Sequence, residues 1–195
     1  MDLGIRGKRA LVCGSSKGLG LGCATALAEA GVHIIMNARS EKDLLDSAEL
    51  INNSYEVDVQ IAVGDITSTK DQKNIISLAG DIDILITNSG GPPPGTWADW
   101  DKLDFLAALE SNMLTPIVLM KQFLPQMMQK GWGRIINITS QSVKAPISNL
   151  GLSNSARAGL TGYVAGTSRQ VAHSGVTINN LLPGGQQTDR IKNLL

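Results

Sequence analysis

Short runs of apolar residues alternate with longer amphipathic stretches along most of the chain. The apolar runs, rich in Val and Ile, predict strands at residues 9–13, 33–37, 57–63, 82–87, 134–139 and 176–182. The stretches between them predict helices at about residues 18–30, 41–53, 68–79, 101–130 and 153–174. Strands that are apolar nearly throughout and separated by helices are typical of a parallel sheet covered on both faces. The pattern therefore predicts a doubly wound α/β fold, with a single domain over residues 1–195.

Composition narrows the class of protein further. The 195 residues carry 17 Lys and Arg against 17 Asp and Glu, so no excess of basic charge indicates binding to nucleic acid or to an anionic membrane. No apolar run is long enough to span a bilayer, and no apolar segment follows the basic N-terminus as in a signal peptide. Cys13 and Cys23 form neither a disulfide framework nor a metal-ligand spacing. We therefore expect a cytoplasmic globular protein without a metal site.

A glycine-rich run, GSSKGLG at residues 14–20, directly follows the first predicted strand and opens the first predicted helix. Glycines let the backbone turn sharply and approach a ligand closely, and the free N–H groups of a helix start attract anions. A strand before the turn and a helix after it are the context of a dinucleotide-binding site. The predicted phosphate-binding residues are Gly14, Ser16, Lys17, Gly18, Leu19 and Gly20.

The turn after the second strand lacks the carboxylate that holds the ribose 2′-hydroxyl of NAD. Asn37 stands where we expect that acidic residue, and Arg39 and Ser40 follow it. A guanidinium here, with Lys17 of the glycine-rich turn as a second cation, suits the 2′-phosphate of NADP. The sequence therefore predicts NADP(H) as the cofactor, with Arg39 and Ser40 in the 2′-phosphate site.

Taken in order, the motifs make the chain resemble the short-chain dehydrogenase/reductase family, whose members have the Rossmann fold. The glycines have the family's spacing G-x-x-x-G-x-G, and further motifs extend over nearly the whole chain. They are Asp65-Ile66 after the third strand, Thr87-Asn88-Ser89-Gly90 at the fourth, Asn112 in the long helix, Ser140 after the fifth strand, and Pro183-Gly184 with Thr188 after the sixth.

This resemblance implies an NADP(H)-dependent enzyme that interconverts a carbonyl and an alcohol on a small molecule, and the narrower likeness is to 3-oxoacyl-(acyl-carrier-protein) reductases. It implies that Asp65 and Ile66 contact adenine, and that Asn112 anchors a water and Ser140 orients the carbonyl. It also implies a homo-oligomer, a dimer or a tetramer. The residues that would frame the nicotinamide half are Asn88, Gly90, Pro183, Gly184 and Thr188.

The chain departs from the family at its most important motif. The family's Tyr-x-x-x-Lys stands 13 residues after the catalytic Ser, and counting from Ser140 places Ser153 at the Tyr position and Arg157 at the Lys position. An alkyl hydroxyl is a much weaker acid than a phenol, whose pKa is ~10, so Ser153 is a poor general acid. Arg157 keeps the positive charge, and it is expected to hold the ribose or polarise an oxyanion.

Two readings of this substitution stay open. Either Ser153 and Arg157 are a modified catalytic pair, or the chain is a nucleotide-binding regulatory or scaffold protein with an inactivated reductase site. The segment from Gly91 to Trp97 is likewise either the rim of a substrate site or only a stiff loop. The sequence also ends where family members continue into a further helix and a seventh strand. We expect either a short chain or a C-terminal region that lies outside the sequence given.

Overall fold

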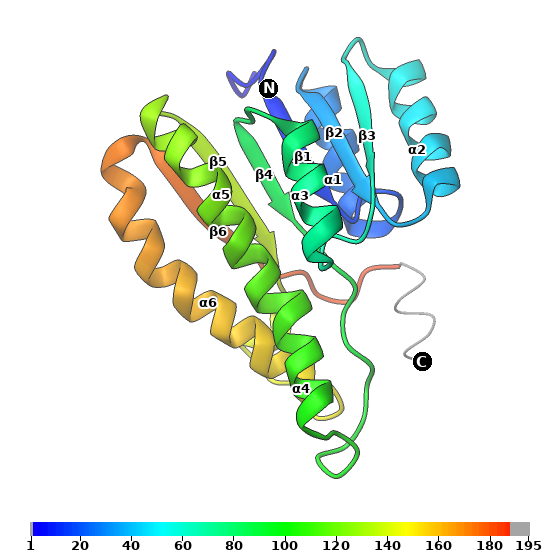
Figure 1. Cartoon of the computed structure of the whole chain (residues 1–195), viewed down its shortest axis with the longest axis vertical. Coiled ribbons are helices and arrows are strands. Elements are labelled where there is room, and N and C mark those ends of the chain that lie inside the picture. Colours follow the sequence, from blue (N-terminus) through cyan, green and yellow to red (C-terminus); the bar gives the residue numbers. More distant parts are fainter. Residues whose placement is uncertain (1, 188–195) are drawn as a thin grey trace.

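The computed structural model describes residues 2–187 (Figure 1). The strands are β1 (Arg9–Cys13), β2 (His33–Ala38), β3 (Val59–Val63), β4 (Ile84–Thr87), β5 (Gly133–Ile138) and β6 (Val176–Leu181). The helices are α1 (Gly18–Glu29), α2 (Glu41–Ser54), α3 (Thr69–Ala79), α4 (Lys102–Leu109), α5 (Thr115–Gln129) and α6 (Gly151–Val171). Three shorter helical turns are η1 (Glu110–Leu114), η2 (Gln141–Val143) and η3 (Ala172–Ser174).

All strand pairs are parallel, in the order β3-β2-β1-β4-β5-β6. The predicted doubly wound sheet is therefore confirmed, and each predicted strand lies within a few residues of an observed one. The order reverses between β1 and β4, and in such sheets the crevice at the carboxyl ends of the strands beside this reversal is where ligands bind. The glycine-rich turn follows β1 at that edge of the sheet.

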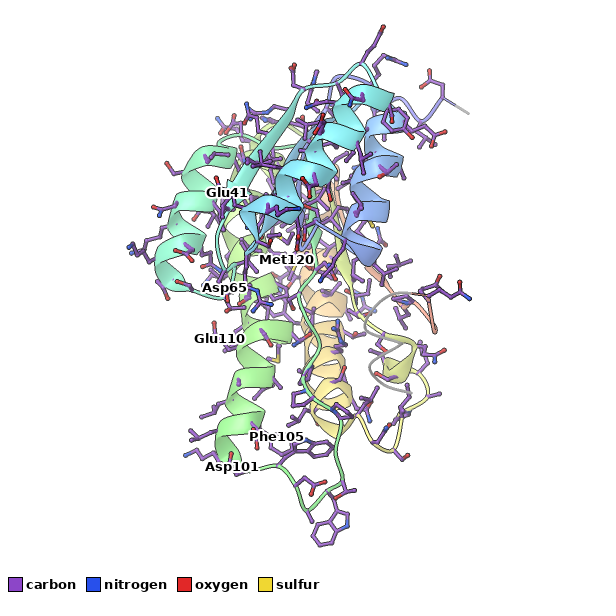
Figure 2. The ribbon with its side chains drawn as sticks, turned by 90° about the vertical axis from the view of Figure 1, so that its right-hand side faces the viewer. Glu41, Asp65, Asp101, Phe105, Glu110 and Met120 are labelled. Carbon is purple, nitrogen blue, oxygen red and sulfur yellow. The ribbon has the colours of Figure 1, made fainter. Side chains whose placement is uncertain are left out.

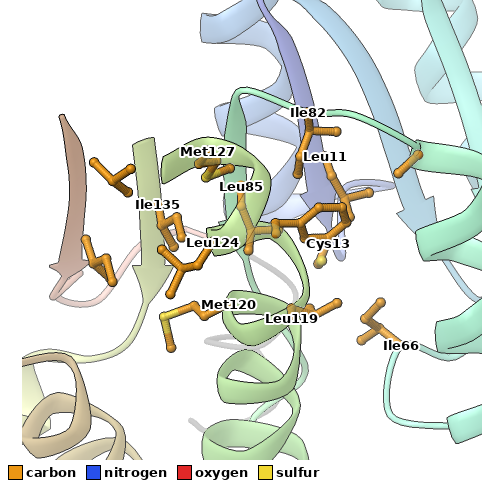
Figure 3. Packing of buried hydrophobic residues seen from close by; sticks show 14 of the residues in the cluster. Leu11, Cys13, Ile66, Ile82, Leu85, Leu119, Met120, Leu124, Met127 and Ile135 are labelled. Atoms are coloured by element: carbon orange, nitrogen blue, oxygen red, sulfur yellow. The ribbon is translucent and has the colours of Figure 1, made fainter. Parts of the chain in front are cut away.

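Helices cover both faces of the sheet. Successive residues of β1 point to opposite faces, so Leu11 and Cys13 join one apolar cluster while Ala10 and Val12 join the other. The first cluster contains α3, α5 and α6, and the second contains α1 and α2. Figure 3 shows the first cluster, in which residues of α5 pack against those of the central strands: Leu119, Met120, Leu124 and Met127 against Leu11, Leu85 and Ile135. Each large apolar side chain buried here contributes about 1.5–3 kcal/mol.

The long helix predicted at 101–130 is confirmed, and it contains one turn of a different type. It begins with a capping box in which Asp101 accepts hydrogen bonds from the amides of Leu103 and Asp104. Between α4 and α5 the chain makes the wider π-type turn η1. Apolar periodicity does not reveal such a turn, because one widened turn leaves the pattern of buried positions on either side nearly unchanged.

The continuous helical stretch Lys102–Gln129 is long and apolar enough, by length and composition, to cross a membrane. In the structure, however, α5 packs against the sheet, with Leu119, Met120 and Phe123 buried almost completely. This is how a core helix of an α/β domain packs, so the apolarity of α5 is accounted for by the fold.

The two cysteines differ in their predicted reactivity. Burial raises the pKa of the Cys13 thiol to about 12, and partial burial also raises the pKa of the Cys23 thiol. Because a raised thiol pKa lowers the fraction of reactive thiolate, the buried Cys13 is the less reactive of the two cysteines. We expect Ellman's reagent to label the native protein slowly and at Cys23 only, and to label both thiols after unfolding in guanidinium. Two rapidly reacting thiols in the native protein would contradict this placement of Cys13.

Candidate active site

The glycine-rich turn between β1 and α1 is built on close backbone contacts. Gly14 and Gly18 have φ values of 59° and 58°, which residues with a side chain rarely adopt. A Cβ atom at Gly14 would lie 2.7 Å from Nδ2 of Asn88, and one at Gly20 would collide with the carbonyl oxygen of Gly14. The start of α1 therefore lies directly against the end of β1, and its amide groups face the edge of the sheet, as a phosphate-binding turn requires.

Serine side chains hold this turn in place. The buried Ser15 donates its amide to the carbonyl of Asn37 (2.9 Å) and accepts the Asn37 amide at Oγ (3.0 Å). Ser47 of α2 donates its hydroxyl to the carbonyl of Ser16 (2.8 Å). Sequence reasoning missed Ser15 and Ser47 as positioning residues. The signal available for Ser15 was only its place inside the glycine-rich run.

The cations predicted for the 2′-phosphate lie at the ends of β1 and β2. Arg39, directly after β2, is exposed over 82% of its side chain, and its NH1 lies 4.0 Å from Oδ2 of Asp65. Ser40 is the N-cap of α2 and accepts the Asp43 amide. Lys17, the N-cap of α1, is also exposed. The structure thus leaves two solvent-facing cations beside a helix start, which is a suitable setting for a phosphate group.

The interpretation of Asn37 needs correction. Its side chain is buried within β2, and Nδ2 donates to the carbonyls of Ala62 (2.8 Å) and Gly64 (3.2 Å) across β3. Asn37 is therefore a sheet residue that ties β2 to β3, and it does not stand in for a ribose-binding acid. The first side chains that leave the sheet at this edge belong to Arg39 and Ser40.

Asp65, labelled in Figure 2, follows β3 in a turn in which the Ser68 amide donates to its carbonyl. Its Oδ1 accepts hydrogen bonds from the amide and the hydroxyl of Thr67. The bond from the Thr67 amide, followed by the bond from its hydroxyl and the charge of Arg39, lowers the pKa of Asp65. Asp65 is thus held as a carboxylate at the carboxyl edge of the sheet, while the side chain of Ile66 is buried in the core beneath it.

The end of β4 is joined to the π-type turn η1 by polar contacts. Ser89 Oγ donates to the carbonyl of Ser111 (2.9 Å), and Asn112 Nδ2 donates to the carbonyl of Gly90 (3.3 Å) and to Oγ of Ser111 (2.7 Å). Oδ1 of the buried Asn112 has no partner among the described residues. A buried acceptor of this kind is a suitable anchor for an ordered water molecule.

Ser153 and Arg157 lie where α6 passes the end of β5, the strand that Ser140 follows by two residues. Arg157 Nε donates to Oγ of Ser153 (3.1 Å), and NH1 donates to the carbonyl of Ile138 (2.7 Å), two residues before Ser140. Ser153 and Arg157 are both buried. The guanidinium is thus folded back along α6 against Ser153.

The loops after β5 and β6 are bonded to each other. Thr139 donates its amide and its hydroxyl to the carbonyl of Leu181, and the Gln141 amide donates to the carbonyl of Pro183. Pro183 and Gly184 therefore lie beside the loop that carries Ser140. Thr188 lies outside the described residues. A cleft of about 520 Å³ runs between the start of α1 and residues 186 and 187, and Gly18, Leu19 and Cys23 are among the residues that line it.

The loop between β4 and α4 is fixed at its tip. The Gly95 amide donates to the carbonyl of Asn149, and the Trp100 ring lies against both Gly95 and Gly151 at the start of α6. Figure 2 shows Asp101 and Phe105 nearby, at the end of α4 farthest from the sheet. Trp97 remains 90% exposed. Both interpretations of this loop, a substrate rim and a stiff connection, stay open.

The tyrosines and histidines within the described residues lie in other parts of the fold. Tyr55 ends α2, His33 begins β2 and His173 precedes β6, which places all three at the amino-terminal edge of the sheet. Tyr163 packs against the apolar cluster between α6 and the sheet. Within residues 2–187, no group of three His, Cys, Asp or Glu side chains is placed to hold a metal ion.

Comparison with known proteins assigns nearly the whole chain to one family. The family model described as short chain dehydrogenase matches residues 8–195. A 3-oxoacyl-(acyl-carrier-protein) reductase from Vibrio cholerae is 31% identical over 194 residues, 98% of this chain and 79% of that protein. One from Rickettsia conorii is 29% identical over 95% of this chain and 75% of that protein.

Solved structures agree with this placement. L-sorbose reductase from Gluconobacter frateurii, complexed with NADPH and L-sorbose, superposes with a TM-score of 0.94 at 26% identity, over 99% of this chain and 75% of that chain. A 3-oxoacyl-(acyl-carrier-protein) reductase from Agrobacterium tumefaciens with NADP bound gives a TM-score of 0.91 at 27% identity, over 97% of this chain and 74% of that chain.

Proposed function

This chain belongs to the short-chain dehydrogenase/reductase family, and from that premise we propose that it is an NADP(H)-dependent oxidoreductase that interconverts a carbonyl and an alcohol. The observation that carries the proposal is the glycine-rich turn, in which Gly14 and Gly20 leave no room for a Cβ atom and the start of α1 faces the carboxyl edge of the sheet. Similar reductases whose structures contain NADPH or NADP support the choice of cofactor.

The residues of this chain suit the cofactor along its whole length. Gly14, Ser16, Gly18, Leu19 and Gly20 would hold the pyrophosphate at the start of α1. Lys17, Arg39 and Ser40 would bind the 2′-phosphate, and Asp65 and Ile66 the adenine. Asn88, Gly90, Pro183, Gly184 and Thr188 would frame the nicotinamide. The bound nicotinamide would supply a hydride to the substrate carbon, or accept one from it.

The catalytic roles fall to four residues. Ser140 would orient the substrate oxygen, and Asn112 would hold a water through its unpartnered Oδ1. Arg157 would contact the ribose, and its bond to Ser153 fixes the hydroxyl that replaces the usual phenol. Proton delivery would then come from solvent or from the substrate. Resemblance to 3-oxoacyl-(acyl-carrier-protein) reductases favours an oxoacyl thioester as the carbonyl compound.

The substitution at Ser153 and Arg157 also favours a second candidate function. A protein with this site would bind NADP(H) and regulate or support a partner without efficient turnover. Both candidates require cofactor binding, and they differ only in catalysis. Measuring NADPH binding and NADPH oxidation on the same sample separates them.

For the intact protein we further propose a cytoplasmic homo-oligomer, a dimer or a tetramer. Support for an oligomer comes from large apolar side chains that are exposed along one helical stretch. They are Leu103 and Leu106 on α4, Leu114 in η1, and Val118 on α5.

Changing Arg39 to Asp tests the cofactor assignment. We expect Arg39→Asp to weaken NADPH binding at least tenfold, since a charge-assisted bond contributes about 1.5–3 kcal/mol, and to leave NADH binding nearly unchanged. Fluorescence titration of both cofactors measures the effect. Arg169→Asp, at an exposed position near the end of α6, is the matched control. An equal loss of affinity for the two cofactors would disprove the 2′-phosphate site.

A further inference from the structure

Two serine hydroxyls at the candidate active site each accept a hydrogen bond from an N–H group. Ser153 Oγ accepts a hydrogen bond from Arg157 Nε (3.1 Å), and Ser140 Oγ accepts one from the Ser142 amide (3.1 Å). No described residue accepts the hydrogen of either hydroxyl, since no bond is formed in which Ser140 or Ser153 donates. A hydroxyl whose oxygen already accepts an N–H directs its own hydrogen elsewhere. Each hydroxyl therefore has a hydrogen that it can donate to a ligand.

The elements that carry the two donors are bonded to each other. Arg157 NH1 donates to the carbonyl of Ile138, which ties the Ser153 side of α6 to the strand that ends just before Ser140. Ser153 and Arg157 are 5% and 8% exposed, so water is largely excluded around their bond. In such surroundings a donor polarised by a guanidinium binds an oxyanion more strongly than it would in water.

The same two donors cannot readily give up a proton. A serine hydroxyl resembles water, and its pKa lies far above that of a tyrosine phenol, which is ~10. The alkoxide made from an isolated ketone is about as basic as hydroxide, so it needs a proton that these residues do not supply. A phenolate or enolate oxygen is far less basic, and hydrogen bonds alone suffice to hold it as an anion.

We propose that Ser140 and Ser153, with Arg157 behind Ser153, form an oxyanion-binding site that selects ligands whose negative charge is delocalised, namely phenolates and enolates. The inference rests on the proposed function and narrows its substrate class. Suitable substrates are quinone–quinol pairs, because a quinone that takes up a hydride becomes a quinol anion whose charge is delocalised. Hydride addition to an isolated ketone, or to the ketone of a 1,3-dicarbonyl compound such as a 3-oxoacyl thioester, gives a localised alkoxide, so these compounds are poorer substrates for this site. Arg157 acts here as a positioning residue through Ser153.

A titration of 4-nitrophenol tests this site without any turnover. The ligand is titrated against pH with excess protein, with and without NADP⁺, and its phenolate absorbance is followed. We expect the protein to bind the phenolate at least tenfold more tightly than the phenol, which lowers the pKa of the bound ligand by one unit or more. Ser153→Ala and Ser140→Ala are each expected to abolish most of this preference.

Ser155→Ala is the matched control, because Ser155 is an exposed serine of α6 whose hydroxyl donates within the helix to Gly151. It should behave as the native protein does. The inference is overturned if 4-nitrophenol does not bind, if phenol and phenolate bind equally, or if Ser153→Ala leaves the preference intact. A parallel NADPH titration distinguishes failure of this inference from failure of the proposed function. If the protein binds NADPH but shows no preference for the phenolate, only this inference is overturned. If the protein does not bind NADPH, the proposed function itself is overturned.

Discussion

Replacing Ser153 with Tyr and Arg157 with Lys in the same protein will raise its turnover of isolated ketones and 3-oxoacyl thioesters about 100-fold or more. A positioned general acid contributes about 10²–10⁴-fold to such reactions. The double change restores a phenol and removes the guanidinium that lies against Ser153. NADPH oxidation followed at 340 nm, on native and variant proteins matched for cofactor binding, measures the gain.

Both positions have to change together. Ser153→Tyr alone puts a ring into a buried site that the Arg157 side chain already occupies, and overpacking of this kind costs about 1–3 kcal/mol. The control pairs Ser155→Tyr with Arg169→Lys, which makes the same chemical changes at exposed positions of α6. A double variant that folds and binds NADPH, yet gains no turnover, would show that the missing phenol is not what limits this site.

Gly20→Ala is expected to have the largest effect on the fold of the cofactor site. A Cβ atom at Gly20 collides with the carbonyl oxygen of Gly14 and lies 2.7 Å from its carbonyl carbon. Because backbone has to move to relieve this clash, we expect a loss of about 2–3 kcal/mol in the free energy of unfolding. NADPH affinity should fall at least tenfold, since the start of α1 is displaced from the phosphate position. Chemical denaturation and cofactor titration measure the two effects.

Gly22→Ala is a closely matched control in the same helix. No atom lies within 4 Å of a Cβ built at Gly22, and alanine is the better helix former by about 1 kcal/mol. This variant should therefore be as stable as the native protein or slightly more so, with unchanged NADPH affinity. If Gly20→Ala proved as well tolerated as Gly22→Ala, the close contact between β1 and α1 would be wrong.

Much of the fold could be predicted because its signal is local. The central strands β1, β2 and β4 are short apolar runs buried on both faces. The glycine-rich turn lies between a strand and a helix, so both features were predictable from sequence order alone. The π-type turn η1 was not predictable, because its residues have no composition that distinguishes them from those of an ordinary α-helix. The contacts of Asn37 were not predictable either, since its place in the chain does not reveal that its amide binds the carbonyls of Ala62 and Gly64.

The sequence predicts which residues belong to the candidate site better than it predicts the contacts between them. Spacing from Ser140 brings Ser153 and Arg157 into one site, and the structure joins these two residues by a hydrogen bond. Neither the direction of the Arg157 side chain nor the bond to Ile138 follows from spacing, because both depend on how α6 crosses the end of β5. The same holds for Ser15 and Ser47, whose bonds cross from one element to another.

The most direct test of NADP(H) dependence is an equilibrium titration of the native protein with NADPH and, separately, with NADH. The glycine-rich turn, with Lys17 and Arg39 beside it, predicts saturable binding of NADPH that is at least tenfold tighter than binding of NADH. Absence of NADPH binding, or equal affinity for the two cofactors, would contradict the account.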